Sequence, residues 1–105
     1  MTIHRQPHTF KEWLVQRNAC EPAIKWVGSK DAEQAWEQCE HPWWLVWYII
    51  VTHIAALSEV DEKIYKVTGD RTFRCYKDNP LEVCRILRES FTFKLPDELI
   101  ESELP

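Results

Sequence analysis

The sequence predicts an all-α fold, a compact bundle of about five to six short helices around a central tryptophan-rich helix. Apolar residues recur at the three- and four-residue spacing of amphipathic helices along most of the chain. Capping residues or prolines precede several of these segments, as they do at helix starts. The chain is 45% hydrophobic and contains six tryptophans, which places it far from the composition of disordered proteins.

The length of 105 residues is typical of one domain, so residues 1–105 are expected to form a single domain. Residues 1–8 and 96–105 are the expected mobile ends. The first ten residues lack the apolar run of a secretory signal peptide, which favours a cytoplasmic location. The cysteines would be reduced there and serve as small core residues; they are Cys20, Cys39, Cys75 and Cys84.

Three short helices are expected before the central one. Thr9 is a suitable cap for a helix over 10–17, and Glu12 can complete a capping box. A glutamate and a proline begin a second helix over 21–28, which a glycine ends. A third amphipathic helix opens at 29–31, with apolar residues at helical spacing.

The central helix is expected over 42–57, because Pro42 starts an uninterrupted apolar run that includes three tryptophans. Its length of 16 residues falls short of the roughly 20 that span a bilayer, and acidic residues flank it. A buried strand is the weaker alternative, since the run is long for a strand and begins with proline. We therefore expect its tryptophans to specify the core, with His53 as a hydrogen-bonded core residue.

Residues 59–77 allow two interpretations. As one helix, they gather Lys63, Lys66, Arg74 and Lys77 on one side, opposite an apolar stripe. As a small β-hairpin at 63–76, two strands would flank the turn formed by Gly69 and Asp70. The helix is favoured, and the hairpin stays open as the alternative.

The next segment carries a clearer helix signal. Asn79 can cap a helix, Pro80 suits its first position, and Glu82 fits a capping box, so a helix is expected to about Ser90. The acidic tail from Pro96 is expected either to form a short helix or to stay mobile.

No motif for chemistry emerges, so the chain is not expected to be an enzyme or to hold a cofactor or metal. The cysteines and histidines lack zinc spacing, since there is no Cys-x-x-Cys pair. Two glycines cannot form a glycine-rich phosphate loop. No thiol or hydroxyl has a specific activating histidine in the sequence pattern.

Charge is segregated along the chain. Residues 63–94 hold eight basic and four acidic side chains, a balance of +4, whereas the whole chain carries -4 and the remainder therefore -8. Such segregation favours oriented association with a charged partner. The candidate partner-binding or nucleic-acid-binding residues are Lys63, Lys66, Arg71, Arg74 and Lys77.

Part of the chain resembles a known group of proteins. The resemblance lies between residues 20 and 47, at Cys20, Ala23, Trp26, Ala35, Trp36, Cys39, Trp44, Leu45 and Trp47. This pattern resembles small helical proteins encoded by bacteriophages and bacteria, mostly uncharacterised and some labelled as immunity proteins. The resemblance implies a small accessory protein of phage or mobile-element type.

The expected function is therefore binding of another macromolecule, with an inhibitor of a bacterial defence system as one concrete version. A protein partner is expected and a membrane partner is not. The alternative is a nucleic-acid-binding protein that uses the basic segment 63–94. An apolar central helix also leaves room for a homodimer, because it can expose more apolar surface than one small domain covers.

Overall fold

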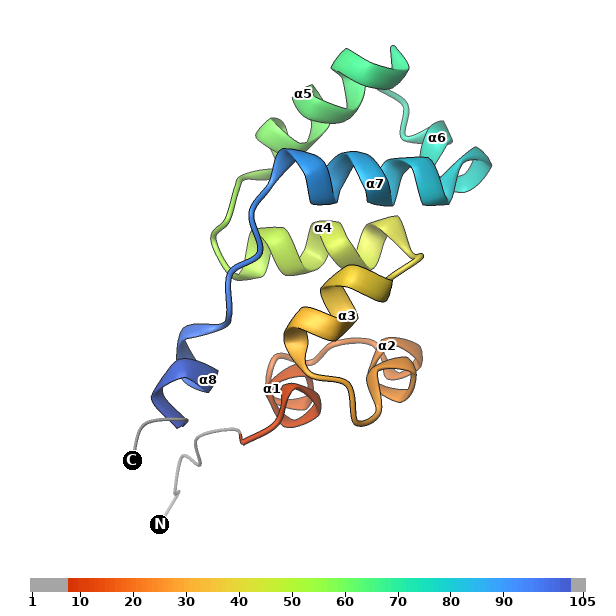
Figure 1. The fold of residues 1–105 in the computed structure, drawn as a ribbon. Helices are drawn as coiled ribbons and strands as arrows, with labels where there is room; N and C mark the ends of the chain where they lie inside the picture. Colours follow the sequence, from red (N-terminus) through yellow and green to blue (C-terminus); the bar gives the residue numbers. More distant parts are fainter. Residues whose placement is uncertain (1–7, 103–105) are drawn as a thin grey trace. The chain divides into compact units, whose positions relative to one another are not determined.

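The computed structural model describes residues 8–102, and this part of the chain folds into eight helices without a β-strand (Figure 1). The predicted all-α fold is confirmed. The described residues form two compact units, one up to Ala35 and from Leu95 on, the other from Trp36 to Lys94. Of the predicted mobile ends, residues 1–7 and 103–105 lie outside the described residues, whereas 97–102 form a helix.

The first unit contains α1 (Phe10–Gln16), α2 (Glu21–Val27), the beginning of α3 (Ala32–Gln38) and α8 (Asp97–Ser102). The predicted cap of α1 is present, because the Thr9 hydroxyl oxygen accepts a hydrogen bond from the Glu12 backbone N–H at 3.1 Å. The Glu12 carboxylate accepts from the N–H of His8, one residue before the cap. Phe10, Trp13 and Leu14 are the buried face of α1.

Glu98 joins α8 to α1 within this unit. The Trp13 indole Nε1 donates a hydrogen bond to Glu98 at 3.2 Å, and Arg17 forms an ion pair with the same carboxylate. The acidic tail therefore forms a short helix, one of the two predicted outcomes, and one of its acids pairs with the cation that follows the first helix.

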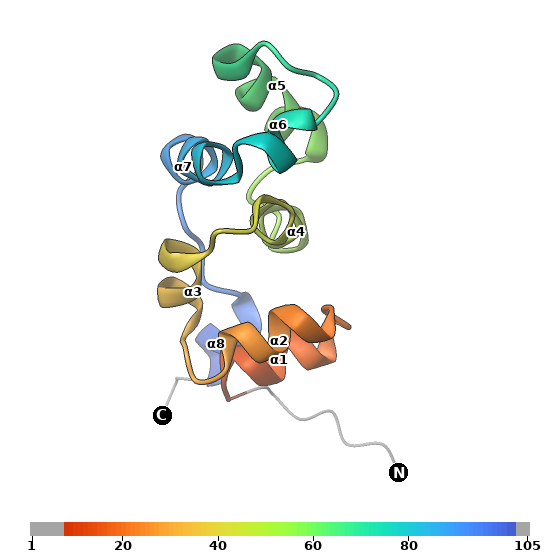
Figure 2. The same cartoon turned by 90° about the vertical axis from the view of Figure 1, so that its right-hand side faces the viewer.

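The second unit contains the end of α3 together with α4 (Pro42–Val51), α5 (Leu57–Thr68), α6 (Arg74–Asp78) and α7 (Pro80–Ser90). Helices α4 and α7 lie side by side and are both seen nearly end-on in Figure 2. Aliphatic side chains and one thiol fill the space between α4, α5 and α7; they are Leu45, Val46, Ile49, Val60, Ile64, Val83, Cys84, Ile86 and Leu87.

The central helix is shorter than predicted, ending at Val51 rather than at 57. His53 adopts a left-handed conformation (φ 61°), and the N–H of Ile54 bonds to the carbonyl of Ile49 at 2.9 Å. This is the geometry of a Schellman cap, here with a histidine where glycine is common. The prediction that His53 lies in the core is wrong, because the terminated helix leaves its side chain exposed.

The prediction that the tryptophans of α4 fill the core is wrong. Trp43 is 51% exposed, and Trp44 and Trp47 are half-buried. The buried tryptophans are instead Trp13 on α1 and Trp36 on α3. A helix that is apolar all round has more apolar surface than its neighbours in a small unit can cover, so aliphatic side chains occupy the core and tryptophan lies at its edge.

Residues 59–77 form helices, as favoured, but two of them rather than one. Gly69 takes the left-handed conformation (φ 71°) and ends α5, and α6 begins five residues later at Arg74. The alternative hairpin at 63–76 does not form. Helix α7 ends at Ser90 as predicted, although the Asn79 side chain makes no capping hydrogen bond.

Candidate macromolecule-binding surface

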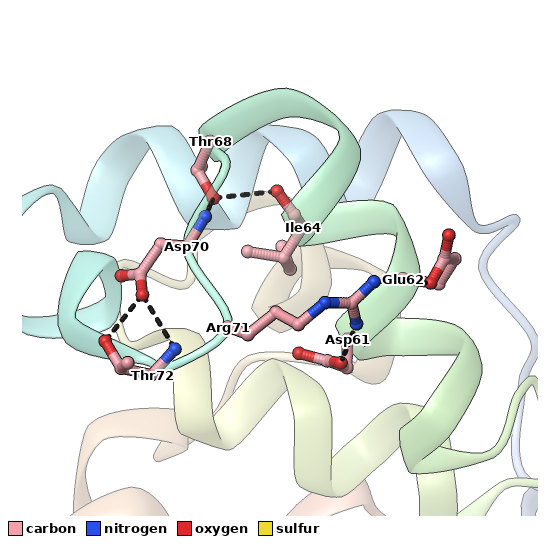
Figure 3. Close-up of polar contacts among 7 residues, drawn as sticks. All are labelled: Asp61, Glu62, Ile64, Thr68, Asp70, Arg71 and Thr72. Carbon is pink, nitrogen blue, oxygen red and sulfur yellow. Dashed lines mark hydrogen bonds and ion pairs between the residues drawn. The ribbon is translucent and has the colours of Figure 1, made fainter.

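The structure separates the eight basic residues of the segment 63–94 by what their side chains do. Arg71 lies in the loop after α5, and its side chain extends back to that helix (Figure 3). Its guanidinium is 3.0 Å from the Asp61 carboxylate and 3.4 Å from that of Glu62, and it covers the Tyr65 ring at 3.8 Å from the ring centroid. Arg71 is therefore a structural cation of α5, and two carboxylates already balance its charge.

Three further cations also serve the fold. Arg85 pairs on α7 with Glu82 and Glu89. Arg88 donates hydrogen bonds to the carbonyl oxygens of Trp36 and Cys39, and Lys94 donates to the carbonyl of Thr52 at 3.2 Å. Because Glu82 pairs with Arg85, it does not complete the predicted capping box. Half of the basic residues in this segment therefore make ion pairs or hydrogen bonds within the protein.

The remaining four are exposed, and within residues 8–102 they form no ion pair and no side-chain hydrogen bond; they are Lys63, Lys66, Arg74 and Lys77. They occur as two pairs, each with three-residue spacing, the first on α5 and the second on α6. Their charges are available to an anionic partner.

The two pairs do not continue one helical stripe, because α5 ends before α6 begins. Asp61 and Tyr65 mark the flank of α5 that meets Arg71. Helical spacing places Lys63 on the opposite flank, whereas Lys66 lies one turn beyond Glu62, the second carboxylate that Arg71 meets. The structure thus brings Arg74 and Lys77 together on α6, keeps Lys63 and Lys66 on α5, and removes Arg71 from the set of unpaired cations.

Asp70 fixes the loop that leads into α6. One carboxylate oxygen accepts hydrogen bonds from the backbone N–H and hydroxyl of Thr72, at 2.7 and 2.5 Å (Figure 3), and the other accepts from the N–H of Cys75 at 2.8 Å. These hydrogen bonds lower the pKa of Asp70 to about 2. Between them, Phe73 adopts a left-handed conformation (φ 62°), which is unusual for an aromatic residue.

An aromatic cluster connects the start of α4 with α6. The Trp43 ring lies 4.5 Å from the Tyr76 ring and 5.3 Å from that of Phe73, measured between centroids, and Phe73 meets Tyr76 edge to face at 5.3 Å. Tyr76 is buried, and burial raises its pKa to about 12. Its hydroxyl is the one buried side-chain polar atom in the described part of the chain without a hydrogen-bond partner.

The sequence indicated the cations but not the contact of Trp43 with the α6 region. Trp43 precedes Arg74 by 31 positions, and only the packing of α4 against the α6 region brings its ring to Phe73 and Tyr76. The apolar run of α4 did indicate an exposed apolar side chain, because a helix that is apolar on every side must leave one side uncovered in a small unit.

A metal site, a reactive thiol and a membrane-spanning helix each place different requirements on the described residues. No three His, Cys, Asp or Glu side chains among them are grouped so as to hold a metal ion. Cys39, Cys75 and Cys84 are buried, and burial raises the pKa of each thiol, that of Cys84 to about 11, whereas Cys20 is exposed. No described helix is long and apolar enough to cross a membrane.

No protein-family model, curated protein or solved structure matches this chain.

Proposed function

We propose that this chain is a small accessory protein that acts by binding another protein through the unpaired cations and the exposed aromatic ring of its second unit. The observation that carries this proposal is the separation of the cations. Four of eight basic residues in one segment make ion pairs or hydrogen bonds within the protein, and the other four are exposed and make neither among the described residues. Two of these four, Arg74 and Lys77, lie on the helix that packs against Trp43.

Arginine and tryptophan are the residue types that most often dominate the energy of protein interfaces. Unpaired charges beside them steer the encounter and select a partner of opposite sign. The resemblance to small phage and bacterial helical proteins adds the biological class: an accessory protein of phage or mobile-element type. An inhibitor of a bacterial defence system is the concrete version that we propose.

An affinity experiment tests this function. The tagged chain is used to capture proteins from bacterial lysate, beside a variant in which Lys63, Lys66, Arg74 and Lys77 are replaced by alanine. A control variant carries alanine at Lys11 and Lys25, which are exposed on α1 and α2. We expect the wild type and the control to recover one specific protein and the fourfold variant to lose it while keeping its helical circular dichroism. Repeated capture of no specific protein contradicts the proposal.

Nucleic-acid binding is the second candidate, and the same four cations favour it together with Trp43 and Phe73 as stacking groups. It predicts retention on heparin and a mobility shift of DNA or RNA that weakens steeply as salt rises. Absence of binding at low salt contradicts this alternative. The net charge of -4 weakens it, because a polyanion is repelled by the rest of the chain.

A further inference from the structure

Trp43 differs from the other five tryptophans, which are buried or half-buried, because about half of its surface is open to solvent. Its inner side rests on Tyr76 and Phe73, so the exposed indole is supported from behind by two aromatic rings. An aromatic side chain that is already held in place loses little conformational freedom when a partner covers it.

Two unpaired cations lie on α6, the helix whose Tyr76 contacts this ring. Lys77 directly follows Tyr76, and Arg74 precedes Lys77 by one helical turn, so both lie on the solvent side of the short helix. The acid nearest in sequence is Asp78, and the acid before α6, Asp70, is occupied by Thr72 and Cys75. The helix that supports the exposed ring therefore carries two exposed cations without a described ion pair.

We infer that Trp43, Arg74 and Lys77 form one docking surface for an acidic segment of a partner protein, in which aliphatic side chains lie between carboxylates. The aliphatic groups cover the indole, and the carboxylates meet Lys77 and Arg74. This inference rests on the proposed function and names the chemistry of its partner.

Charge matching favours a protein segment over nucleic acid as the occupant. Double-stranded DNA presents a phosphate charge about every 1.7 Å along its axis, whereas α6 offers two unpaired cations with Asp78 beside them. An acidic protein segment can place a small number of carboxylates opposite these two cations and still supply apolar cover for Trp43.

The test uses defined probes and the signals of the six indole N–H groups in a nitrogen-15 spectrum, one for each tryptophan. The full chain is titrated at low salt with a synthetic peptide that alternates glutamate and leucine. A second peptide carries glutamine in place of each glutamate, and a single-stranded oligothymidylate represents nucleic acid. The Trp43 signal is assigned by its loss in Trp43→Phe, which keeps an aromatic ring against Tyr76.

We expect the acidic peptide to shift the Trp43 signal and the glutamine peptide to bind at least roughly tenfold more weakly. Trp43→Ala is expected to weaken binding by roughly thirtyfold, the size of an interface hot spot, and the double variant Arg74→Gln, Lys77→Gln by roughly tenfold. Leu81→Ala removes an equally exposed apolar side chain from α7 and is the control, with no change expected.

Three outcomes overturn the inference: an unmoved Trp43 signal, equal binding of the glutamine peptide, or tighter binding of the oligothymidylate. If Trp43→Ala loses its helical spectrum, the Trp43→Phe variant decides, because binding at full strength without the indole also contradicts the inference. A specific protein captured from lysate together with a negative peptide titration leaves the proposed function standing and removes only this partner class.

Discussion

The Arg88 guanidinium on α7 donates hydrogen bonds to the carbonyl oxygens of Trp36, at 3.3 Å, and Cys39, at 2.9 Å. These carbonyls lie at the C-terminal end of α3, where the helix cannot satisfy its own acceptors. A cation at this end is also favoured by the helix dipole. One side chain of α7 thereby anchors the segment that leads into α4.

Replacing Arg88 by methionine should destabilise the protein by about 1.5–3 kcal/mol, because it removes hydrogen bonds from a charged donor and leaves two carbonyls without a partner. Urea unfolding measures the change. Arg85→Met is the matched control on the same helix, where the arginine makes only exposed ion pairs with Glu82 and Glu89. Equal losses in the two variants would contradict the anchoring role of Arg88.

Tyr48→Phe should cost about 1–3 kcal/mol of unfolding free energy. The buried Tyr48 hydroxyl donates a hydrogen bond to the carbonyl of Lys94, and the variant leaves that acceptor unpaired. Thermal unfolding checks this. Tyr65→Phe keeps the ring beneath Arg71 and serves as the control, since no hydrogen bond of its hydroxyl is found among the described residues. Unchanged stability of Tyr48→Phe contradicts the prediction.

His53→Gly should stabilise the protein by about 1 kcal/mol, because glycine adopts the left-handed conformation at the end of α4 without the steric penalty of a Cβ atom. Asn18 ends α1 in the same conformation (φ 58°), and asparagine tolerates it better than histidine. Asn18→Gly should therefore gain less. Chemical denaturation of both variants gives the comparison, and a larger gain at Asn18 would be inconsistent with this reasoning.

Asp70 should make stability depend on acidity at low pH. Its pKa is lowered from 3.8 to about 2 in the folded protein, so the unfolded chain binds the proton more readily. The stabilising effect is complete above the unfolded value and is lost as pH falls through about 4 to about 2. Melting temperatures across this range should fall less steeply in Asp70→Asn than in the wild type.

Asp78→Asn is the control for that experiment, because Asp78 is exposed on the neighbouring helix and accepts no hydrogen bond in the described part of the structure. The control should follow the wild-type pH profile. A profile of Asp70→Asn that also matches the wild type would contradict the role of the loop carboxylate.

Local signals in the sequence were sufficient where neighbouring residues decide the structure. Thr9 caps α1 as expected, and Pro80 occupies the first turn of α7. The end of α4 could not be predicted in the same way, because histidine at position 53 carries no strong preference for the left-handed conformation that stops the helix. The break at Gly69 was visible as a turn signal but fitted a hairpin as well as a helix end.

The candidate surface could not be predicted from sequence, because it depends on contacts between residues far apart in the chain. The sequence identified the cations, but which of them pair depends on contacts such as that of Arg71 with Asp61, ten positions earlier, and of Arg88 with Cys39, 49 positions earlier. The exposure of Trp43 depends likewise on which sides of α4 the neighbouring helices cover. Sequence spacing within one helix cannot supply either fact.

Cys20 stands exposed before α2, while the other three thiols are buried. A maleimide dye added to the folded protein should therefore attach at one position, on the unit that does not carry the proposed docking surface. The native chain can therefore be labelled or immobilised at this one thiol without mutation. Attachment of further dye would report unfolding that exposes the three buried thiols.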